Sequence, residues 1–240
     1  MNICTYYIAL KDTSFQFPSQ PVLKKIIKEG GGLFLFKGAA SFYTMSNTII
    51  IGFLCPIQYA GYYSAADKII KALRGLVNPI NRVLFPRLSS LVRGGPHEAI
   101  KVLQVNMVLT VTLSFIMGGA IFVSSPFVVK LVLGGGFEEV VPVLRVLALL
   151  LPIVAISSSL GIQWMVPLGL EWPMNRVIIL AGLLNLGVSL AVVPFFLHMG
   201  SAWSVLLTEV FIALSLFLYL TCKKLIPARS NLQAIKAHCH

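Results

Sequence analysis

Charged side chains are scarce in this 240-residue chain: Asp, Glu, Lys and Arg make up 11% of it, and only 8 residues are acidic. Soluble globular proteins average about 25% charged residues. Hydrophobic residues make up 57% of the chain, and its mean hydropathy is +0.87. The composition therefore excludes an ordinary soluble domain. It also excludes intrinsic disorder, which requires low hydrophobicity and high net charge.

The chain also lacks the residue groups that metal centres and enzymes need. Its 4 cysteines show no CxxC spacing, and its 4 histidines fall in expected loops or near the C-terminus. Glu138 and Glu139 are the only adjacent acidic residues, so the sequence has no carboxylate cluster for magnesium. It has no glycine-rich phosphate loop and no nucleophile elbow. We therefore expect no metal site, no cofactor and no enzymatic activity.

Long runs without charge are what the sequence has instead. One extends from Gly38 to Ala66 and another from Val102 to Val129. A membrane-spanning helix needs about 20 predominantly apolar residues. The runs therefore predict an all-α, polytopic membrane protein with a six-helix lobe at residues 33–222. We place its helices at residues 33–54, 62–88, 102–129, 141–162, 176–197 and 202–222.

The net charge of +11 is unevenly distributed along the chain. In a soluble protein such an excess would indicate nucleic-acid binding, whereas in a membrane protein it marks cytoplasmic loops. With the six helices above, twelve cations fall on one side of the membrane and only Lys130 falls on the other. We therefore expect no nucleic-acid partner. We also expect a cytoplasmic N-terminal segment at residues 1–32 and a basic cytoplasmic tail at residues 223–240.

The predicted helix at residues 62–88 carries too many charges to face lipid on all sides. At 100° per residue, however, its polar side chains share one face about 100° wide. This polar arc consists of Asp67, Lys71, Arg74, Asn78, Asn81 and Arg82. We interpret the segment as a membrane helix that lines a wet cavity, to which Asn47 and Lys37 of the preceding helix are further candidate contributors.

Six cations lie within or at the edges of the predicted spans: Lys37, Lys68, Lys71, Arg74, Arg82 and Arg145. A cation at the centre of a bilayer costs about 2.5–3.5 kcal/mol on insertion scales. Asp67 and Glu209 are the only acidic residues in these spans, and Asp67 is spaced to pair with Lys71. An anionic ligand in a water-filled cavity would balance the remaining charge. The alternative is that the long side chains extend to the headgroups.

The asparagines, several small residues and the tryptophans can also be interpreted from the sequence. The asparagines can bind sugar hydroxyls, or they can join helices through hydrogen bonds. Gly118 and the group Ser157-Ser158-Ser159 with Gly161 favour close helix packing. Trp164, Trp172 and Trp203 fall near predicted helix ends, where tryptophan is typical of an interfacial anchor.

An ordered string of motifs resembles the bacterial polysaccharide and O-antigen flippases. The first part runs from Ala60-Gly61-Tyr62-Tyr63 through Asp67-Lys68 to Phe85-Pro86-Arg87-Leu88. The later part includes Val143-Leu144-Arg145-Val146-Leu147, Leu160-Gly161-Ile162-Gln163, Leu183-Leu184-Asn185-Leu186 and Glu209. No single motif is specific by itself, so the resemblance rests on their order.

This resemblance implies the multidrug/oligosaccharidyl-lipid/polysaccharide exporter superfamily, whose members consist of two six-helix lobes. The chain resembles the C-terminal half. The implied function is alternating-access transport of an undecaprenyl-diphosphate-linked oligosaccharide across the inner membrane, for surface polysaccharide synthesis. The resemblance implies that Asp67, Lys71 and Arg74 line the cavity. Arg145 and Glu209 match recurrent charged positions, which have either a coupling or a structural role.

Two alternatives stay open on the sequence. The first is a multidrug or small-solute antiporter of the same superfamily, for which a more acidic or aromatic cavity is expected. The second is a truncated half that does not transport without a partner. That partner would be a second copy of the chain or an N-terminal six-helix lobe.

Overall fold

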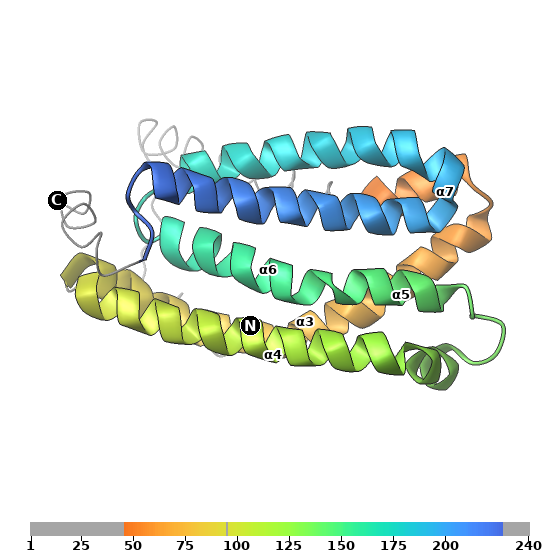
Figure 1. Ribbon diagram of the computed structural model, residues 1–240, viewed down its shortest axis with the longest axis horizontal. Coiled ribbons are helices and arrows are strands. Elements are labelled where there is room, and N and C mark those ends of the chain that lie inside the picture. Colours follow the sequence, from red (N-terminus) through yellow and green to blue (C-terminus); the bar gives the residue numbers. More distant parts are fainter. Residues whose placement is uncertain (1–45, 95, 228–240) are drawn as a thin grey trace, which may run out of the picture. The chain divides into compact units, whose positions relative to one another are not determined.

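The computed structural model describes residues 46–94 and 96–227. Residues 46–54 are helical. The longer elements are α3 (Ile57–Gly94), α4 (Pro96–Leu133), α5 (Val140–Ala148), α6 (Leu150–Ser158), the π-helix η1 (Ser159–Met165) and α7 (Glu171–Cys222), as Figure 1 shows. These two ranges contain helices and no strand, so the predicted all-α fold is confirmed.

Three of the described helical segments are long and apolar enough to cross a membrane. They are His97–Leu133, Val140–Met165 and Glu171–Cys222, with hydropathies of 2.0, 2.5 and 2.3. Helix α3 is not among them, because its polar arc lowers its mean hydropathy. The chain is therefore a multi-pass membrane protein. The total of six membrane spans stays a prediction.

Helix α7 reverses direction at Leu197, whose backbone angles, φ 52° and ψ −135°, are not helical. Its two halves lie side by side (Figure 1), and Asn185 Nδ2 donates a hydrogen bond to Thr208 Oγ1 between them at 3.3 Å. The turn is tight at Gly200. A Cβ atom there would lie 3.0 Å from the Val192 carbonyl oxygen and 3.1 Å from the Val193 Cα atom. A residue larger than glycine would push the two halves apart.

The helices pack into a bundle in which α4 contacts α3, α5 and α6, while α7 contacts α6. Gly118 permits the close approach of α4 to α5, because a Cβ atom there would lie 2.9 Å from the Ala148 carbonyl oxygen. This agrees with the packing role that the sequence indicates for Gly118. An apolar cluster joins residues of the 46–54 helix and of helices α3, α4, α5, α6 and α7, such as Ile51, Tyr63 and Leu144.

Trp164 is not an interfacial anchor, so that interpretation is wrong. Its side chain is fully buried, and its indole Nε1 donates a hydrogen bond to the Leu225 carbonyl oxygen at 2.8 Å. Gln104 Nε2 donates to the neighbouring Pro227 carbonyl oxygen, also at 2.8 Å. Because the indole N–H has an acceptor inside the protein, Trp164 has no need of the water at an interface. Trp172 and Trp203 are exposed.

Candidate functional site

The polar arc of α3 contains the ion pair that the sequence predicts. Lys71 Nζ lies 2.6 Å from Asp67 Oδ2, one helical turn away. Both side chains are partly exposed: the exposed fraction is 49% for Lys71 and 25% for Asp67. The pair therefore neutralises Lys71 locally, although an exposed pair of this kind adds little to stability.

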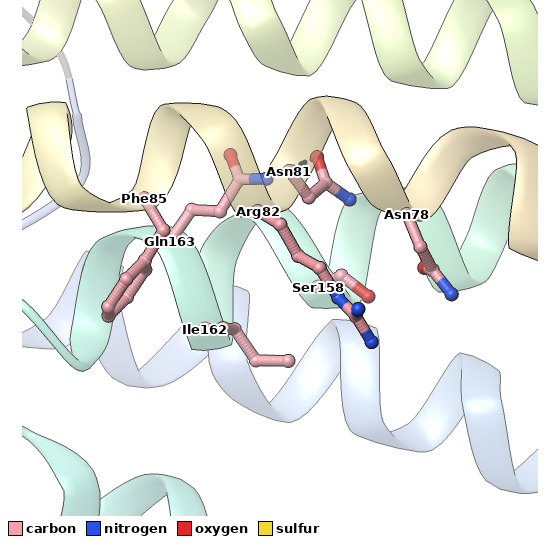
Figure 2. A pocket seen from close by; sticks show the side chains of 7 residues that line it. All are labelled: Asn78, Asn81, Arg82, Phe85, Ser158, Ile162 and Gln163. Carbon is pink, nitrogen blue, oxygen red and sulfur yellow. Dashed lines mark hydrogen bonds between the residues drawn. The ribbon is translucent and has the colours of Figure 1, made fainter. Parts of the chain in front are cut away.

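A cavity of about 360 Å³ opens where α3 faces α6 and η1 (Figure 2). Its lining consists of Asn78, Asn81, Arg82, Phe85, Ser158, Ile162 and Gln163. A smaller cavity adjoins it and shares Asn78, Asn81 and Ser158 with it. Arg74 lines this second cavity, together with residues of α4 such as Ser114 and Met117. The structure thus brings four of the predicted residues to the two adjoining cavities: Arg74, Asn78, Asn81 and Arg82.

The charge around the two cavities is positive. Neither lining contains an acidic residue. Within residues 46–94 and 96–227, Arg74 and Arg82 form no ion pair. Between them lie the Asn78 and Asn81 amides, which can donate or accept hydrogen bonds. The site can therefore bind an acceptor-rich or anionic group.

Three buried or partly buried amide side chains meet at the wall of the larger cavity. Asn81 Oδ1 accepts hydrogen bonds from Gln163 Nε2 and, at 3.4 Å, from Asn106 Nδ2. Asn106 Nδ2 also donates to Gln163 Oε1. This amide triad of Asn81, Asn106 and Gln163 joins α3, α4 and η1. Figure 2 shows Gln163 reaching Asn81 from the facing helix. The triad holds Asn81 and Gln163, two residues of the cavity lining, against each other, while Asn106 Oδ1 has no hydrogen-bond partner among the described residues.

The other candidate residues lie outside both cavities or outside the described ranges. Asn47 is buried, and its Oδ1 accepts a hydrogen bond from Ser189 Oγ at 2.8 Å, a contact that joins the 46–54 helix to α7. Arg145 Nε donates to Ser125 Oγ at 3.0 Å. The partly buried Glu209 belongs to the second half of α7 and to neither lining. Lys37 lies outside the described residues.

The sequence interpretation missed Gln163, Ser158 and Phe85 as cavity residues. Ser158 belongs to a group for which the sequence predicts close packing, and Gln163 belongs to one of the motifs that carry the family resemblance. Gln163 is the only amide side chain in the uncharged run from Val146 to Leu170, which was a usable signal. Its orientation was not predictable, because it lies in a π-helix with a different periodicity from an α-helix.

Comparison with known proteins finds a matching family and similar curated proteins, whose names concern polysaccharide biosynthesis or O-antigen transport. Residues 2–92 match the family described as "Polysaccharide biosynthesis protein". The "Putative O-antigen transporter" of Escherichia coli (strain K12) is 26% identical over 208 residues, which cover 85% of this chain and 49% of the relative. The protein of the same name from Shigella dysenteriae is 32% identical over 196 residues, covering 80% and 48%. The chain thus spans about half the length of these curated relatives. No solved structure matches it.

Proposed function

Because the chain resembles bacterial polysaccharide and O-antigen transporters along most of its length, we propose that it is a flippase-type transporter or one lobe of such a transporter. Its cargo is an undecaprenyl-diphosphate-linked oligosaccharide, which it moves across the bacterial inner membrane. The observation that carries the proposal is the acid-free cavity on the polar face of α3, with Arg74 and Arg82 in its two parts.

Arg74 is the better anchor for the diphosphate. A guanidinium can grip phosphate oxygens with two parallel hydrogen bonds, whereas an ammonium acts as a point charge. Lys71 is also partly neutralised, since its Nζ lies 2.6 Å from Asp67 Oδ2. Arg74 has no such partner in the described part of the chain, and its charge is therefore available to the cargo.

The glycan would lie along the amide side of the cavity. Asn78, Asn81 and Ser158 line both parts and carry groups that can hydrogen-bond to hydroxyls. Phe85 supplies an apolar surface at the edge of the larger part. A hydrated sugar chain needs both kinds of surface, because its ring faces are less polar than its hydroxyl edges.

Alternating access requires two bodies that move against one another. The chain spans 48–49% of its curated relatives, so we propose that it supplies one of these bodies. The second is an N-terminal six-helix lobe or another copy of this chain. In the proposed orientation both termini are cytoplasmic, which the distribution of cations in the predicted loops favours. A small-solute antiporter is less well supported, because neither cavity lining contains an acidic residue.

The test is complementation of a bacterial strain that lacks its own O-antigen flippase. The chain is expressed with the N-terminal half of a two-lobed relative, and surface polysaccharide is measured per amount of membrane protein. We expect export with the wild-type chain and loss of export with Arg74→Ala. Lys68→Ala is the matched control, because Lys68 is an exposed cation of α3 that lines neither cavity. Absence of export despite normal amounts of both partners would contradict the proposal.

A further inference from the structure

We propose that His198, with Tyr59, Tyr62 and Glu139, forms a proton-sensitive clasp that closes one end of the helix bundle. Neutral His198 holds the first turns of α3 to the start of α5 and to the reversal of α7, and protonation releases them. The clasp takes no part in the proposed cargo site. Asn78 follows Tyr59 by 19 positions, which corresponds to about 28 Å along a helix axis. In the proposed orientation the clasp lies at the periplasmic end.

Aromatic rings from two other elements hold the His198 side chain. The Tyr59 ring stacks on the imidazole, with centroids 5.1 Å apart and planes inclined by 18°. Tyr62 meets the imidazole edge-on at 6.0 Å, and Phe137 meets Tyr62 in the same way at 6.1 Å. His198 directly follows Leu197, where α7 reverses. One side chain therefore joins α3 and the start of α5 to this reversal, and Figure 1 shows all three at the same end of the bundle.

The surroundings of the two ring nitrogens favour the neutral imidazole. Nε2 of His198 lies 3.3 Å from the Glu139 carbonyl oxygen, which can only accept, so Nε2 carries the proton. Nδ1 is buried and has no hydrogen-bond partner in the described part of the chain. Protonation would place a second N–H donor at Nδ1 and a positive charge on a residue that is 4% exposed. Both changes are unfavourable where no acceptor is available.

The Glu139 carboxylate has the opposite effect, but a weaker one. Its Oε2 lies 3.8 Å from His198 Nε2 and would attract an imidazolium. The Glu139 side chain is 63% exposed, however, so water and salt screen this attraction. The Tyr59 ring face also attracts cations. Neither the carboxylate nor the ring offers an acceptor to Nδ1, so the closed clasp retains the neutral form of His198.

The closed clasp should lose population as the pH falls. Imidazole is the side-chain group that ordinarily changes charge between about pH 5 and 8, near pH 6.5. Above that value His198 is neutral whether the clasp is closed or open. Below it, an open clasp binds a proton that the closed clasp resists, so the equilibrium moves toward opening. The other titratable side chains on the elements at this end are Cys55, Tyr63, Lys130 and Glu138.

Cys55 is a native reporter of the closed end. It is 8% exposed, and its Sγ donates to the carbonyl oxygen of Val193, which lies one turn before the reversal of α7. Separation of α3 from α7 would expose this thiol. The exposed Cys222 is the internal reference, because the ratio of the two modification rates corrects for the general effect of pH on thiol reactivity.

The test treats the whole chain in lipid nanodiscs with dithiodipyridine, which also reacts with thiols in mild acid, and quantifies both cysteines by mass spectrometry. We expect the ratio of Cys55 to Cys222 modification to rise by about fivefold to tenfold between about pH 8 and pH 5.5, since one linked proton changes an equilibrium by at most about tenfold per pH unit. His198→Gln keeps a donor but cannot be protonated, so its ratio should stay low at both pH values. His97→Gln, at the exposed start of α4, is the matched control and should respond like the wild type.

A wild-type ratio that does not change with pH would overturn the clasp, and so would a pH response that His198→Gln retains. Glu139→Gln separates the two titratable partners. It should keep a response at least as large as that of the wild type, because the carboxylate that attracts an imidazolium is gone. Loss of the response in this variant would identify Glu139 as the trigger and contradict the role of His198.

A second variant covers the case in which His198→Gln does not fold. Tyr59→Leu removes the ring that stacks on His198 and leaves the histidine in place. We expect its Cys55 to Cys222 ratio to be raised already at about pH 8, where the wild-type clasp is closed. An unchanged ratio would contradict the clasp. None of these measurements requires cargo or transport, so a negative result leaves the proposed function intact.

Discussion

Lys71 Nζ lies 2.6 Å from the Asp67 carboxylate, within an ion pair that occupies one turn of α3. Arg74, at the following turn, has no acidic partner in the described part of the chain. The two neighbouring cations of the polar arc are therefore not equivalent. One is largely balanced inside the protein, and the other is available to an anionic ligand.

This difference predicts an order of effects on transport. Arg74→Ala should lower export by about tenfold or more, since a hydrogen bond to a charged group is worth about 1.5–3 kcal/mol. Arg74→Lys should give an intermediate value, because it keeps the charge and loses the planar fork. Lys71→Ala should have a smaller effect than Arg74→Ala. The measurement is surface polysaccharide per amount of protein, and equal effects of both alanine variants would refute the order.

Asn47 should behave as a packing residue, unlike Asn78. Ser189→Ala removes the donor to Asn47 Oδ1, a contact buried between the 46–54 helix and α7. Hydrogen bonds between membrane helices contribute about 0.6 kcal/mol on average. We therefore expect lower resistance to thermal unfolding and unchanged export per folded molecule. Asn78→Ala should show the reverse pattern in the same two measurements, and a transport defect of folded Ser189→Ala would disagree with this assignment.

The membrane orientation can be tested with impermeant thiol reagents on intact cells. Cys55 is a poor target, because it is only 8% exposed and its Sγ donates to the Val193 carbonyl oxygen at 3.9 Å. Burial also raises the pKa of the Cys55 thiol, which reduces the reactive thiolate. Ile57 is a better position, since it is 78% exposed beside the same turn.

In a Cys55→Ser background, Ile57→Cys should be labelled from the periplasm. The exposed Cys222, at the opposite end of the second half of α7, should react only after the cells are opened. Labelling of Cys222 alone on intact cells would show that the orientation is inverted. A variant that carries Cys55→Ser and Cys222→Ser, without Ile57→Cys, gives the background signal.

The reversal of α7 should depend on glycine at one position. Gly200→Ala places a Cβ atom 3.0 Å from the Val192 carbonyl oxygen, and the neighbouring atoms are backbone atoms that cannot easily move. We expect a loss of stability of about 1–3 kcal/mol, as is typical of overpacking. Gly187→Ala is the matched control, because nothing lies within 4 Å of its added Cβ atom. Thermal unfolding in detergent measures both, and equal stabilities would contradict the close approach.

The all-α class, the polar arc and the ion pair could be predicted because each depends on local spacing. Asp67 and Lys71 are one turn apart in any helix, and Arg74, Asn78 and Asn81 follow on the same face. The facing wall could not be predicted in this way. Gln163 approaches Asn81 from 82 residues away, and its orientation depends on a π-helical turn.

Two assignments by residue type were less successful for a related reason. Trp164 was expected at an interface, but a backbone carbonyl from the segment after α7 satisfies its N–H inside the protein. Ser158 was expected in close packing, yet it lines both cavities. Leu225, which accepts from Trp164, and the α3 residues that line the cavities with Ser158 are both distant in the sequence. The periodicity of one helix does not reveal such contacts.

In the proposed function, the polar face of α3 binds a lipid-linked glycan while the glycan crosses the membrane. The most direct test is a flipping assay in proteoliposomes that contain this chain, its partner lobe and a fluorescent undecaprenyl-diphosphate oligosaccharide. Accessibility of the glycan to an external glycosidase is followed with time. We expect rapid exchange between leaflets with the wild-type chain and slow exchange with the double variant Lys71→Ala, Arg74→Ala. Exchange at the wild-type rate by the folded double variant would contradict this proposal.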